Sequence, residues 1–447
     1  TDEWGRAYLV GRVGYDYDDR YVVTLTMRRD GSSKYTGDNK YGYFPSYSVA
    51  WNAHNENFWS LEWFNLLKGR VSYGTLGNDR IGSYRYYSRP STIIASVLVD
   101  DDNDPTTDLV RRNIAGYTKG TLGNPDLRWE TSKQLNVGVD FGLFGNKLSG
   151  TVDVYQTRTT DLLLPEIIPV TNGYRSFITN VGETNNSGID VGLKGSPVEA
   201  GGFNWTVSAN WATNKNEIVR LNREGPNGEP IDDEANGWFI GEDINEIYNY
   251  KFLGIWQEDE ADQAEVYGQV PGDAKFLDVN EDGQITPGED RQFLGNPTPD
   301  WYGGITNTFS YKGLELSVLL ELVQGVTIVN SFIGNYAGRG NQIALDYWTA
   351  ESPGTEYPRA GSSDWTGARG EAVRTVDASF ISLRNVSLSY SLPQDLLSKT
   401  PVRAASFFVR GNNLKYFTNL EHAYSPETGR GAYPIVTSWR FGTSLTF

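Results

Sequence analysis

A run of oxygen-bearing side chains at residues 278–290 is the sharpest candidate for a chemical site in this sequence. Two acids and an amide stand at its first, third and fifth positions, and Gly283 at the sixth permits a sharp turn. This spacing is typical of a calcium loop, because Ca²⁺ prefers roughly six to eight oxygen ligands. The candidate ligands are Asp278, Asn280, Asp282, Gln284 through its backbone carbonyl, and Glu289 or Asp290. We expect a structural Ca²⁺ site, with an acidic turn that binds no ion as the alternative.

Aromatic side chains form the second set of candidates, since Phe, Trp and Tyr make up 13% of the chain, with 27 Tyr and 13 Trp. Aromatic faces bind sugar rings or peptide side chains, and neighbouring acids or amides hydrogen-bond to hydroxyl groups or backbone. The candidate substrate-binding residues are Tyr84, Tyr86, Trp238, Tyr248, Tyr336, Trp348, Trp365 and Tyr424. For any one of them alone, packing in a loop or at a membrane interface is the commoner role.

The sequence contains few of the residues and motifs that other kinds of chemistry require. The chain has no Cys and only His54 and His422, which excludes disulfides, thiolate zinc sites and Cys nucleophiles. It contains no nucleophile elbow, phosphate loop, zinc-protease motif or dinucleotide fingerprint, so we do not expect an enzyme. Its formal charge of −17, from 39 Lys and Arg against 56 Asp and Glu, argues against nucleic-acid binding.

The segments that must position these residues alternate apolar and polar side chains, as the end of the chain shows most clearly. Residues 438–447 place apolar side chains at alternate positions, which predicts a strand with one apolar and one polar face. The last strand of an outer-membrane barrel has this pattern, and its residues would act as an assembly signal. The apolar residues concerned are Trp439, Phe441, Leu445 and Phe447.

The same alternation predicts about thirteen strands, several with small or hydrogen-bonding side chains on the polar face. Such a face suits a wet lumen better than a dry sandwich core. No apolar run reaches the roughly 18 residues of a membrane-spanning helix. The expected strands are 7–17, 21–27, 43–53, 66–75, 132–143, 147–158, 187–196, 203–213, 301–311, 313–323, 376–391, 403–414 and 436–447.

Short and long connections alternate between these strands, as in outer-membrane barrels with tight periplasmic turns and long extracellular loops. We therefore expect an all-β protein, a transmembrane antiparallel β-barrel. An odd strand count and an immediate first strand predict a piece of a larger closed sheet, because an open edge is not viable in lipid. The main long loops are expected near 76–131, 159–186, 214–300, 324–375 and 415–435.

A set of ordered motifs gives the chain a family resemblance that covers nearly its whole length. In this order they resemble the C-terminal barrel half of SusC/RagA-like TonB-dependent outer-membrane transporters. The motifs are Arg28–Ser33, Tyr41–Ser46, Ala50–Trp51, Arg70–Asn78, Gly123–Thr131, Asn180–Glu183 and Asn214–Glu217. The resemblance implies a 22-stranded barrel closed by an N-terminal plug, of which this sequence holds about 13 strands over residues 1–447 and no plug domain.

The resemblance also implies a function and a set of partners. The implied function is active import of a glycan or peptide nutrient across the outer membrane, energised by TonB, with this chain as part of the SusC-like barrel of a SusCD-type complex. The partners are a SusD-like surface lipoprotein that acts as a lid, TonB–ExbB–ExbD acting through the plug, the glycan or peptide ligand, and membrane lipid around the barrel. A dimer of the transporter complex is compatible with this picture.

Two other functions stay open from the sequence: a TonB-dependent siderophore or cofactor transporter, and a soluble extracellular carbohydrate-binding β-protein. The apolar run Ile93–Val99, followed by the acidic run 100–104, has three interpretations. It covers the partner lipoprotein, it folds over the mouth of the barrel, or it is a plain loop strand.

Overall fold

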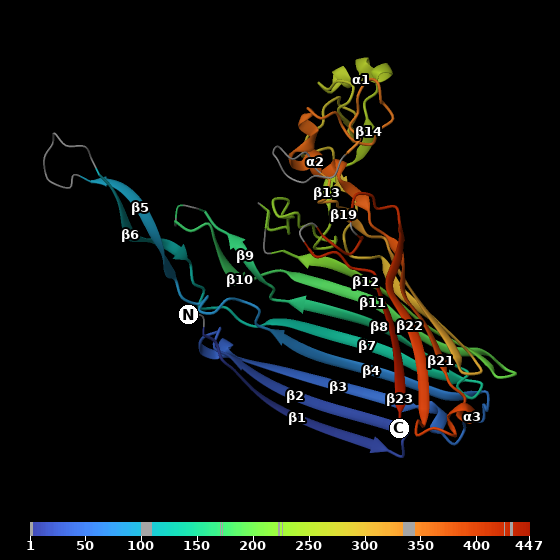
Figure 1. The fold of residues 1–447 in the computed structure, drawn as a ribbon. Helices are drawn as coiled ribbons and strands as arrows, with labels where there is room; N and C mark the ends of the chain where they lie inside the picture. Colours follow the sequence, from blue (N-terminus) through green and yellow to red (C-terminus); the bar gives the residue numbers. More distant parts are fainter. Residues whose placement is uncertain are drawn as a thin grey trace.

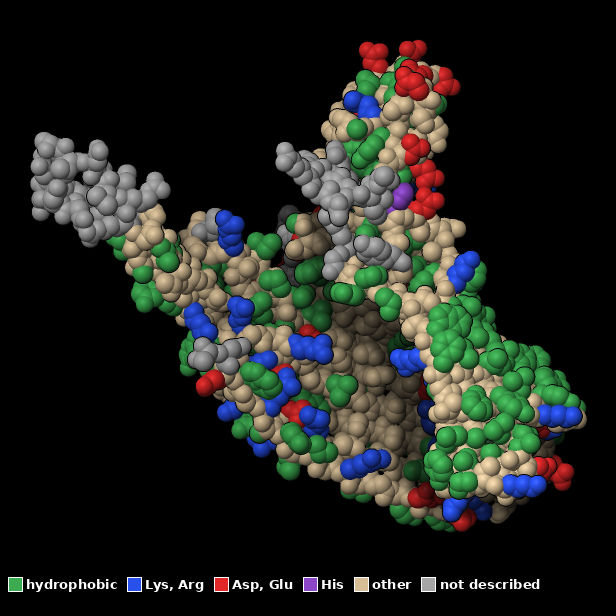
Figure 2. Space-filling view, in the orientation of Figure 1, with side chains coloured by type: hydrophobic (Ala, Val, Ile, Leu, Met, Phe, Trp, Pro, Cys, Tyr) green, Lys and Arg blue, Asp and Glu red, His purple; other side chains and the backbone are tan. Residues whose placement is uncertain are grey.

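The computed structural model describes residues 3–99, 110–169, 171, 173–221, 224–225, 227–333, 345–423, 425–429 and 432–447. Its main feature is one antiparallel sheet of thirteen strands in sequence order, curled into a deep trough (Figures 1 and 2). The strands are β1 (Arg6–Tyr17), β2 (Tyr21–Ser32), β3 (Tyr41–Asn52), β4 (Phe64–Asn78), β7 (Glu130–Leu143), β8 (Leu148–Thr160), β11 (Glu183–Ala200), β12 (Phe203–Arg220), β17 (Trp301–Tyr311), β18 (Leu314–Gln324), β21 (Phe380–Ser391), β22 (Ala404–Thr418) and β23 (Ser438–Thr446).

These thirteen strands confirm the predicted fold class and strand count. One expected strand differs, because 376–391 divides into β20 (Thr375–Asp377) and β21. β20 leaves the large sheet and pairs with β19 (Thr327–Val329). Ser379 fixes the break, since its hydroxyl accepts hydrogen bonds from the amides of Gly325 at 3.0 Å and Val326 at 3.4 Å.

The strand register places apolar side chains in rows across the outer face of the sheet. One row runs through seven neighbouring strands, and six of its members are more than one-third exposed. Figure 2 shows such side chains gathered on the outer wall, while the concave face carries few. The row consists of Tyr15, Val23, Val49, Val71, Val137, Val154 and Ile189. An outer apolar face and a polar concave face are the arrangement of a barrel in lipid.

The two ends of the sheet differ in their connections (Figure 1). At the short-turn end the backbone reverses within a few residues, for example at Asp18 and Asp19, with φ of 56° and 53°, and at Lys312 and Gly313, with φ of 47° and 88°. Positive φ at successive residues gives the turn that matches the twist of paired strands. The connections at the other end, the long-loop end, are long enough to fold on their own.

Five two-stranded sheets and several short helices form within the long connections. None of the described helices is long and apolar enough to span a bilayer. The small sheets pair β5 (Arg89–Val99) with β6 (Val110–Thr121), β9 (Leu163–Ile167) with β10 (Ser176–Asn180), β13 (Tyr248–Tyr250) with β16 (Arg291–Phe293), β14 (Phe252–Ile255) with β15 (Ala274–Phe276), and β19 with β20. The helices are α1 (Ala261–Val266) and α2 (Gly367–Val373) in these connections, and α3 (Gln394–Leu397) at the short-turn end.

The buried apolar clusters lie at the long-loop end rather than inside the trough. One cluster joins Tyr35 and Phe44 to Leu127 and Trp129 at the rim. The others hold together what we call the cap, residues 248–293 and 345–374, which rises above the sheet in Figure 1. The cap is built from two connections that are far apart in the sequence.

Candidate functional site

A groove of about 600 Å³ runs along the concave face over β1 to β4 and β7. Its floor includes the row Thr24, Ser48, Ser72 and Asn136, which alternates with the outer apolar row along the same strands. Arginines 12, 28 and 70 also line it. Small hydroxyl and amide groups beside guanidinium groups hydrogen-bond readily to a polar solute, so this wall suits passage of a hydrophilic molecule.

Arg70 anchors an ion-pair cluster on this wall. Its guanidinium donates to Asp140 at 2.8 and 3.0 Å and to Asp153 at 3.0 and 3.1 Å, which links β4, β7 and β8. Gly138 provides the space for this ion-pair cluster, because a Cβ atom at residue 138 would lie 2.4 Å from Asp153 Oδ1 and 2.8 Å from Arg70 Cζ. The glycine is therefore required by the close approach of the arginine.

A second cluster ties a long loop to the wall around Arg384 of β21. The arginine pairs with Glu321 of β18, and it donates to Glu427 of the β22–β23 connection at 2.8 Å and to the Tyr416 hydroxyl at 3.1 Å. The Tyr416 hydroxyl also donates to Glu427. The ladder of β21 with β22 shifts register at this point, between residues 383 and 385. The shift is a bulge of the kind that re-aims a side chain.

At the rim, Asp79 joins the ends of β1, β2 and β4. This carboxylate is 2% exposed and accepts hydrogen bonds from Arg6 Nε at 3.0 Å and Ser32 Oγ at 2.7 Å. Burial alone would raise the pKa of Asp79. The hydrogen bonds from Arg6 and Ser32, with the charges of Arg6 and Lys34, outweigh burial and hold its pKa below the usual range.

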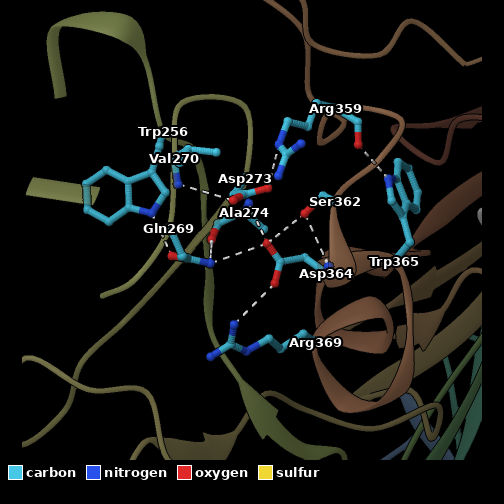
Figure 3. Close-up of polar contacts among 10 residues, drawn as sticks. All are labelled: Trp256, Gln269, Val270, Asp273, Ala274, Arg359, Ser362, Asp364, Trp365 and Arg369. Atoms are coloured by element: carbon cyan, nitrogen blue, oxygen red, sulfur yellow. Dashed lines mark hydrogen bonds and ion pairs between the residues drawn. The ribbon is translucent and has the colours of Figure 1, made fainter. Parts of the chain in front are cut away.

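The two halves of the cap meet at the buried carboxylate of Asp364 (Figure 3). Asp364 is 1% exposed, and its Oδ2 accepts hydrogen bonds from the Ala274 amide at 2.9 Å and from Gln269 Nε2 at 3.3 Å. Ser362 Oγ donates to the same oxygen at 3.1 Å, and Arg369 lies 3.3 Å from Oδ1. The Asp364 carboxylate thus accepts hydrogen bonds from both of the connections that form the cap.

Further contacts complete this junction. Arg359 Nε donates to Asp273 at 2.9 Å, and the Arg359 amide donates to the Gly272 carbonyl at 2.8 Å. Asn249 Nδ2 donates to the Ala368 carbonyl at 2.9 Å, 119 residues away in the sequence. Two loops joined at so many points form one folded unit rather than two independent loops.

The structure separates the predicted aromatic residues into groups that do not converge on one site in the described part of the chain. At the base of the β5–β6 hairpin, Arg89 Cζ lies 4.3 Å from the centroid of the Tyr84 ring, and the Tyr86 ring contacts the Tyr87 ring at a tilt of 44°. Trp238 lies on a turn beside the β9–β10 hairpin, and Tyr248 packs with Phe239 and Phe293. Tyr336 and Tyr424 lie outside the described residues.

Trp348 and Trp365 are in the interior of the cap. They are 8% and 3% exposed, and their indole N–H groups donate to Gln257 at 3.1 Å and to the Arg359 carbonyl at 3.1 Å. Tyr357 stacks on Trp365, and burial and nearby glutamates raise the pKa of this tyrosine to about 12. In this structure the two tryptophans pack the interior of the cap, and their role in substrate binding stays a prediction.

The predicted calcium loop forms one tight turn. The Asp278 carboxylate accepts a hydrogen bond from the Gly283 amide at 2.8 Å, and the Asn280 side chain accepts one from the Asp282 amide at 3.2 Å. Gly283 has a φ of 81°. Burial alone would raise the pKa of Asp278, but the amides of 281–283 keep it below its usual range. Among the described residues no three acidic or histidine side chains converge closely enough to hold a metal ion.

The rival residues at the end of this loop differ in their surroundings. Asp290 is fully buried and accepts the amides of Val279 at 2.8 Å and Thr286 at 2.6 Å. Glu289 is exposed and lies 3.1 Å from Asn280 Nδ2. Asp290 therefore closes the turn, while Glu289 is the carboxylate on the side of Asn280. The Gln284 amide donates to Asp282 at 2.8 Å.

The four apolar residues predicted for the last strand are all exposed, three of them on β23 and Phe447 directly after it. Trp439, Phe441, Leu445 and Phe447 are 56%, 74%, 51% and 70% exposed, as expected for side chains that face lipid. Their role as an assembly signal stays a prediction.

Sequence reasoning missed the charged clusters around Arg70, Asp79, Arg384 and Asp364. A partial signal existed, because an arginine or acid at a lumen position of an alternating strand needs a partner. The identity of each partner depends on strand register and on loop folding, which the pattern does not supply.

Residues 1–414 match the family described as TonB dependent receptor-like, beta-barrel. The TonB-dependent receptor P3 of Formosa agariphila is 32% identical over 474 residues, covering 98% of this chain and 45% of that protein. The TonB-dependent receptor SusC of Bacteroides thetaiotaomicron is 28% identical over 454 residues, covering 98% and 43%.

A solved structure agrees with these relatives. The structure of the RagAB peptide transporter superposes with a TM-score of 0.78 at 26% identity, covering 99% of this chain and 48% of that chain. The chain spans about half the length of the curated relatives it matches.

Proposed function

The chain belongs to the TonB-dependent receptor-like β-barrel family, and from this premise we propose that it is the C-terminal barrel part of a nutrient importer. The importer takes up a glycan or a peptide across the outer membrane with energy delivered through TonB. The observation that carries the proposal is the thirteen-stranded sheet with an apolar outer face and a polar, charged concave face. Similarity to SusC and to the RagAB peptide transporter over nearly the whole chain supports it.

The two faces of the sheet divide the work in this proposal. Outer rows such as that through Val71 and Val137 contact membrane lipid, and the long-loop end faces the cell exterior. The concave face, with its hydroxyl, amide and Arg70 side chains, forms the wall along which the nutrient passes. β1 and β23 are the two edges of the sheet, so further strands from the rest of the receptor pair with them in a closed barrel. The chain supplies walls and binding surface, not catalysis.

We assign the β5–β6 hairpin to contact with a SusD-like surface lipoprotein. A two-stranded ribbon is only marginally stable alone, yet this one stands away from the sheet in Figure 1. Ile94 and Tyr117 on it are 72% and 81% exposed. A hairpin that leans away from the trough favours a partner outside it over closure of the mouth. TonB–ExbB–ExbD would act through a plug in the remainder of the receptor.

We also propose a structural Ca²⁺ in the loop 278–290. The order of its oxygen-bearing side chains and the left-handed Gly283 support this, since both suit a calcium turn. The ion would stiffen the outer part of the cap.

Native purification of the full receptor in mild detergent, with mass spectrometry of every copurifying polypeptide and small molecule, tests the proposed function. We expect a plug-bearing receptor, a surface lipoprotein and a retained glycan or peptide. A chain that stays soluble and monomeric without detergent would contradict the proposal and favour a soluble β-protein.

A further inference from the structure

A cleft of about 330 Å³ lies at the long-loop end of the sheet, between β3, β4 and β7. Its lining includes Tyr41, Tyr43, Thr75 and Lys133. Each of these residues is an even number of positions from the outer apolar row on its own strand, so each lies on the outer face of the sheet. The cleft therefore opens toward the membrane and not toward the concave groove.

The cleft exists because β3 and β4 separate before they end. Their ladder stops at the pair Ser46 and Gly74, although β3 continues to pair with β2, and β4 with β7, beyond this point. The buried rings of Phe44 and Trp129 lie at the gap, with centroids 5.6 Å apart. Backbone groups outside a ladder need other hydrogen-bond partners, which hydrocarbon does not offer. The gap therefore fits the polar headgroup region of the bilayer better than its apolar core.

The outer-facing side chains become cationic toward this end of the sheet. Arg29 of β2, Lys133 of β7 and Arg158 of β8 lie on the outer face beyond the apolar row that crosses the same strands. All three side chains are exposed, and Lys133 and Arg158 are direct neighbours in the ladder of β7 with β8. Cations that follow an apolar band lie at the level of the lipid headgroups, where they attract anionic groups.

Two tyrosines of the cleft hold Arg29 in place. Arg29 Cζ lies 4.1 Å from the centroid of the Tyr41 ring and 5.6 Å from that of Tyr43. Among the described residues Arg29 forms no ion pair with a carboxylate. A guanidinium that lies over aromatic rings keeps its N–H groups available, and it matches the geometry of a phosphate through two parallel hydrogen bonds.

Lys133 is the second cation of the cleft without an acidic partner in the described part of the chain. Arg128 also lines the cleft, but it donates to Asp161 at 2.6 Å, so these two charges offset each other. Asp38 is the remaining acid of the lining. With Arg29 and Lys133 set against Asp38 alone, the site has a surplus of positive charge and suits an anionic group.

We propose that this cleft binds the phosphate group of a lipid in the outer leaflet. Arg29 and Lys133 pair with the phosphate oxygens, and the acyl chains follow the apolar outer face toward the short-turn end. The inference rests on the orientation given in the proposed function, with the long-loop end at the cell exterior, and adds a lipid site to it. Strands of the rest of the receptor that pair with β1 extend the wall sideways and leave its outer face uncovered.

Native mass spectrometry of the detergent-solubilised full receptor, with lipid added in a concentration series, tests the inference. The probes are diphosphoryl lipid A and the same molecule with both phosphates removed, so that the acyl chains are matched. We expect the phosphorylated form to bind at least about tenfold more tightly, because each cation near an anionic headgroup contributes about fivefold in affinity.

The double variant R29Q/K133Q should weaken binding of diphosphoryl lipid A roughly thirtyfold, with no effect on the dephosphorylated form. The matched control K147Q/K312Q makes the same change of charge at two exposed residues of the short-turn end. This control should bind as wild type. Heat-modifiable migration on gels checks that each variant folds.

Equal affinity of wild type for the two forms of lipid A would overturn the inference, as would unchanged affinity in R29Q/K133Q or an equal loss in K147Q/K312Q. Displacement of the lipid by millimolar inorganic phosphate would assign the cleft to a free anion and would also overturn it. Each of these results leaves the import function standing, because uptake through the receptor is measured separately in cells with and without TonB.

Discussion

Replacing Asp364 by alanine should open the cap while leaving the sheet intact. The side chain is 1% exposed, and its loss leaves the Ala274 amide and Gln269 without their acceptor and Arg369 without its partner. Removing one member of a buried, hydrogen-bonded charge pair costs about 3–5 kcal/mol. At about 4 kcal/mol the open fraction of the cap rises roughly a thousandfold.

Amide hydrogen exchange of the full receptor in detergent measures this change. We expect faster exchange in both segments of the cap, 248–293 and 345–374, because Asp364 joins them, and unchanged exchange in β17 and β18. Asp364→Asn should have a smaller effect, since it keeps an acceptor for the Ala274 amide. Glu351→Ala, an exposed acid in the same connection, is the matched control. Wild-type protection of residues 248–293 in the alanine variant would refute the role given to this carboxylate.

Three further predictions concern Asp79 at the rim, the predicted calcium loop 278–290 and the β22–β23 connection. Because the folded pKa of Asp79 is depressed, its stabilisation is complete above its ordinary pKa of about 4 and is lost as pH falls through the folded value. Cleavage near the rim by the acid protease pepsin, normalised to an unfolded substrate at each pH, should rise on acidification in wild type. It should be high and independent of pH in Asp79→Asn. Ca²⁺ should slow proteolysis of the cap in the wild-type receptor, and replacing Asp278 and Asp282 by alanine should abolish this protection. Identical digestion of the wild type with and without Ca²⁺ would contradict the calcium proposal. Arg384→Ala should free the loop segment 425–429, which carries Glu427, from the wall, seen as faster amide exchange there. Unchanged exchange would contradict the role given to Arg384.

The sheet could be predicted because each strand is specified locally. Lipid-facing and polar residues alternate within each strand, as in 132–143. The tight turns contain residues that adopt the left-handed backbone conformation readily, such as Gly313. The break at Ser379 was missed because it depends on hydrogen bonds from Gly325 and Val326, 53 residues or more away.

The cap could not be predicted, because its contacts join distant residues. Gln269 and Asp364 are 95 positions apart, and no periodic pattern marks either as buried. For the same reason an aromatic residue in a long loop gives no sign of whether it packs or binds. Trp348 and Trp365 are interior to the cap, whereas Trp238 lines a pocket, although all three were equal candidates by sequence.

Uptake of a labelled nutrient by cells that carry the full receptor tests the central proposal most directly. The probe is the peptide or glycan that copurifies with the receptor, followed in matched cells with and without functional TonB and with and without the receptor. We expect accumulation only when both are present. Equal accumulation without TonB, or without the receptor, would contradict the account of this chain as part of a TonB-energised importer.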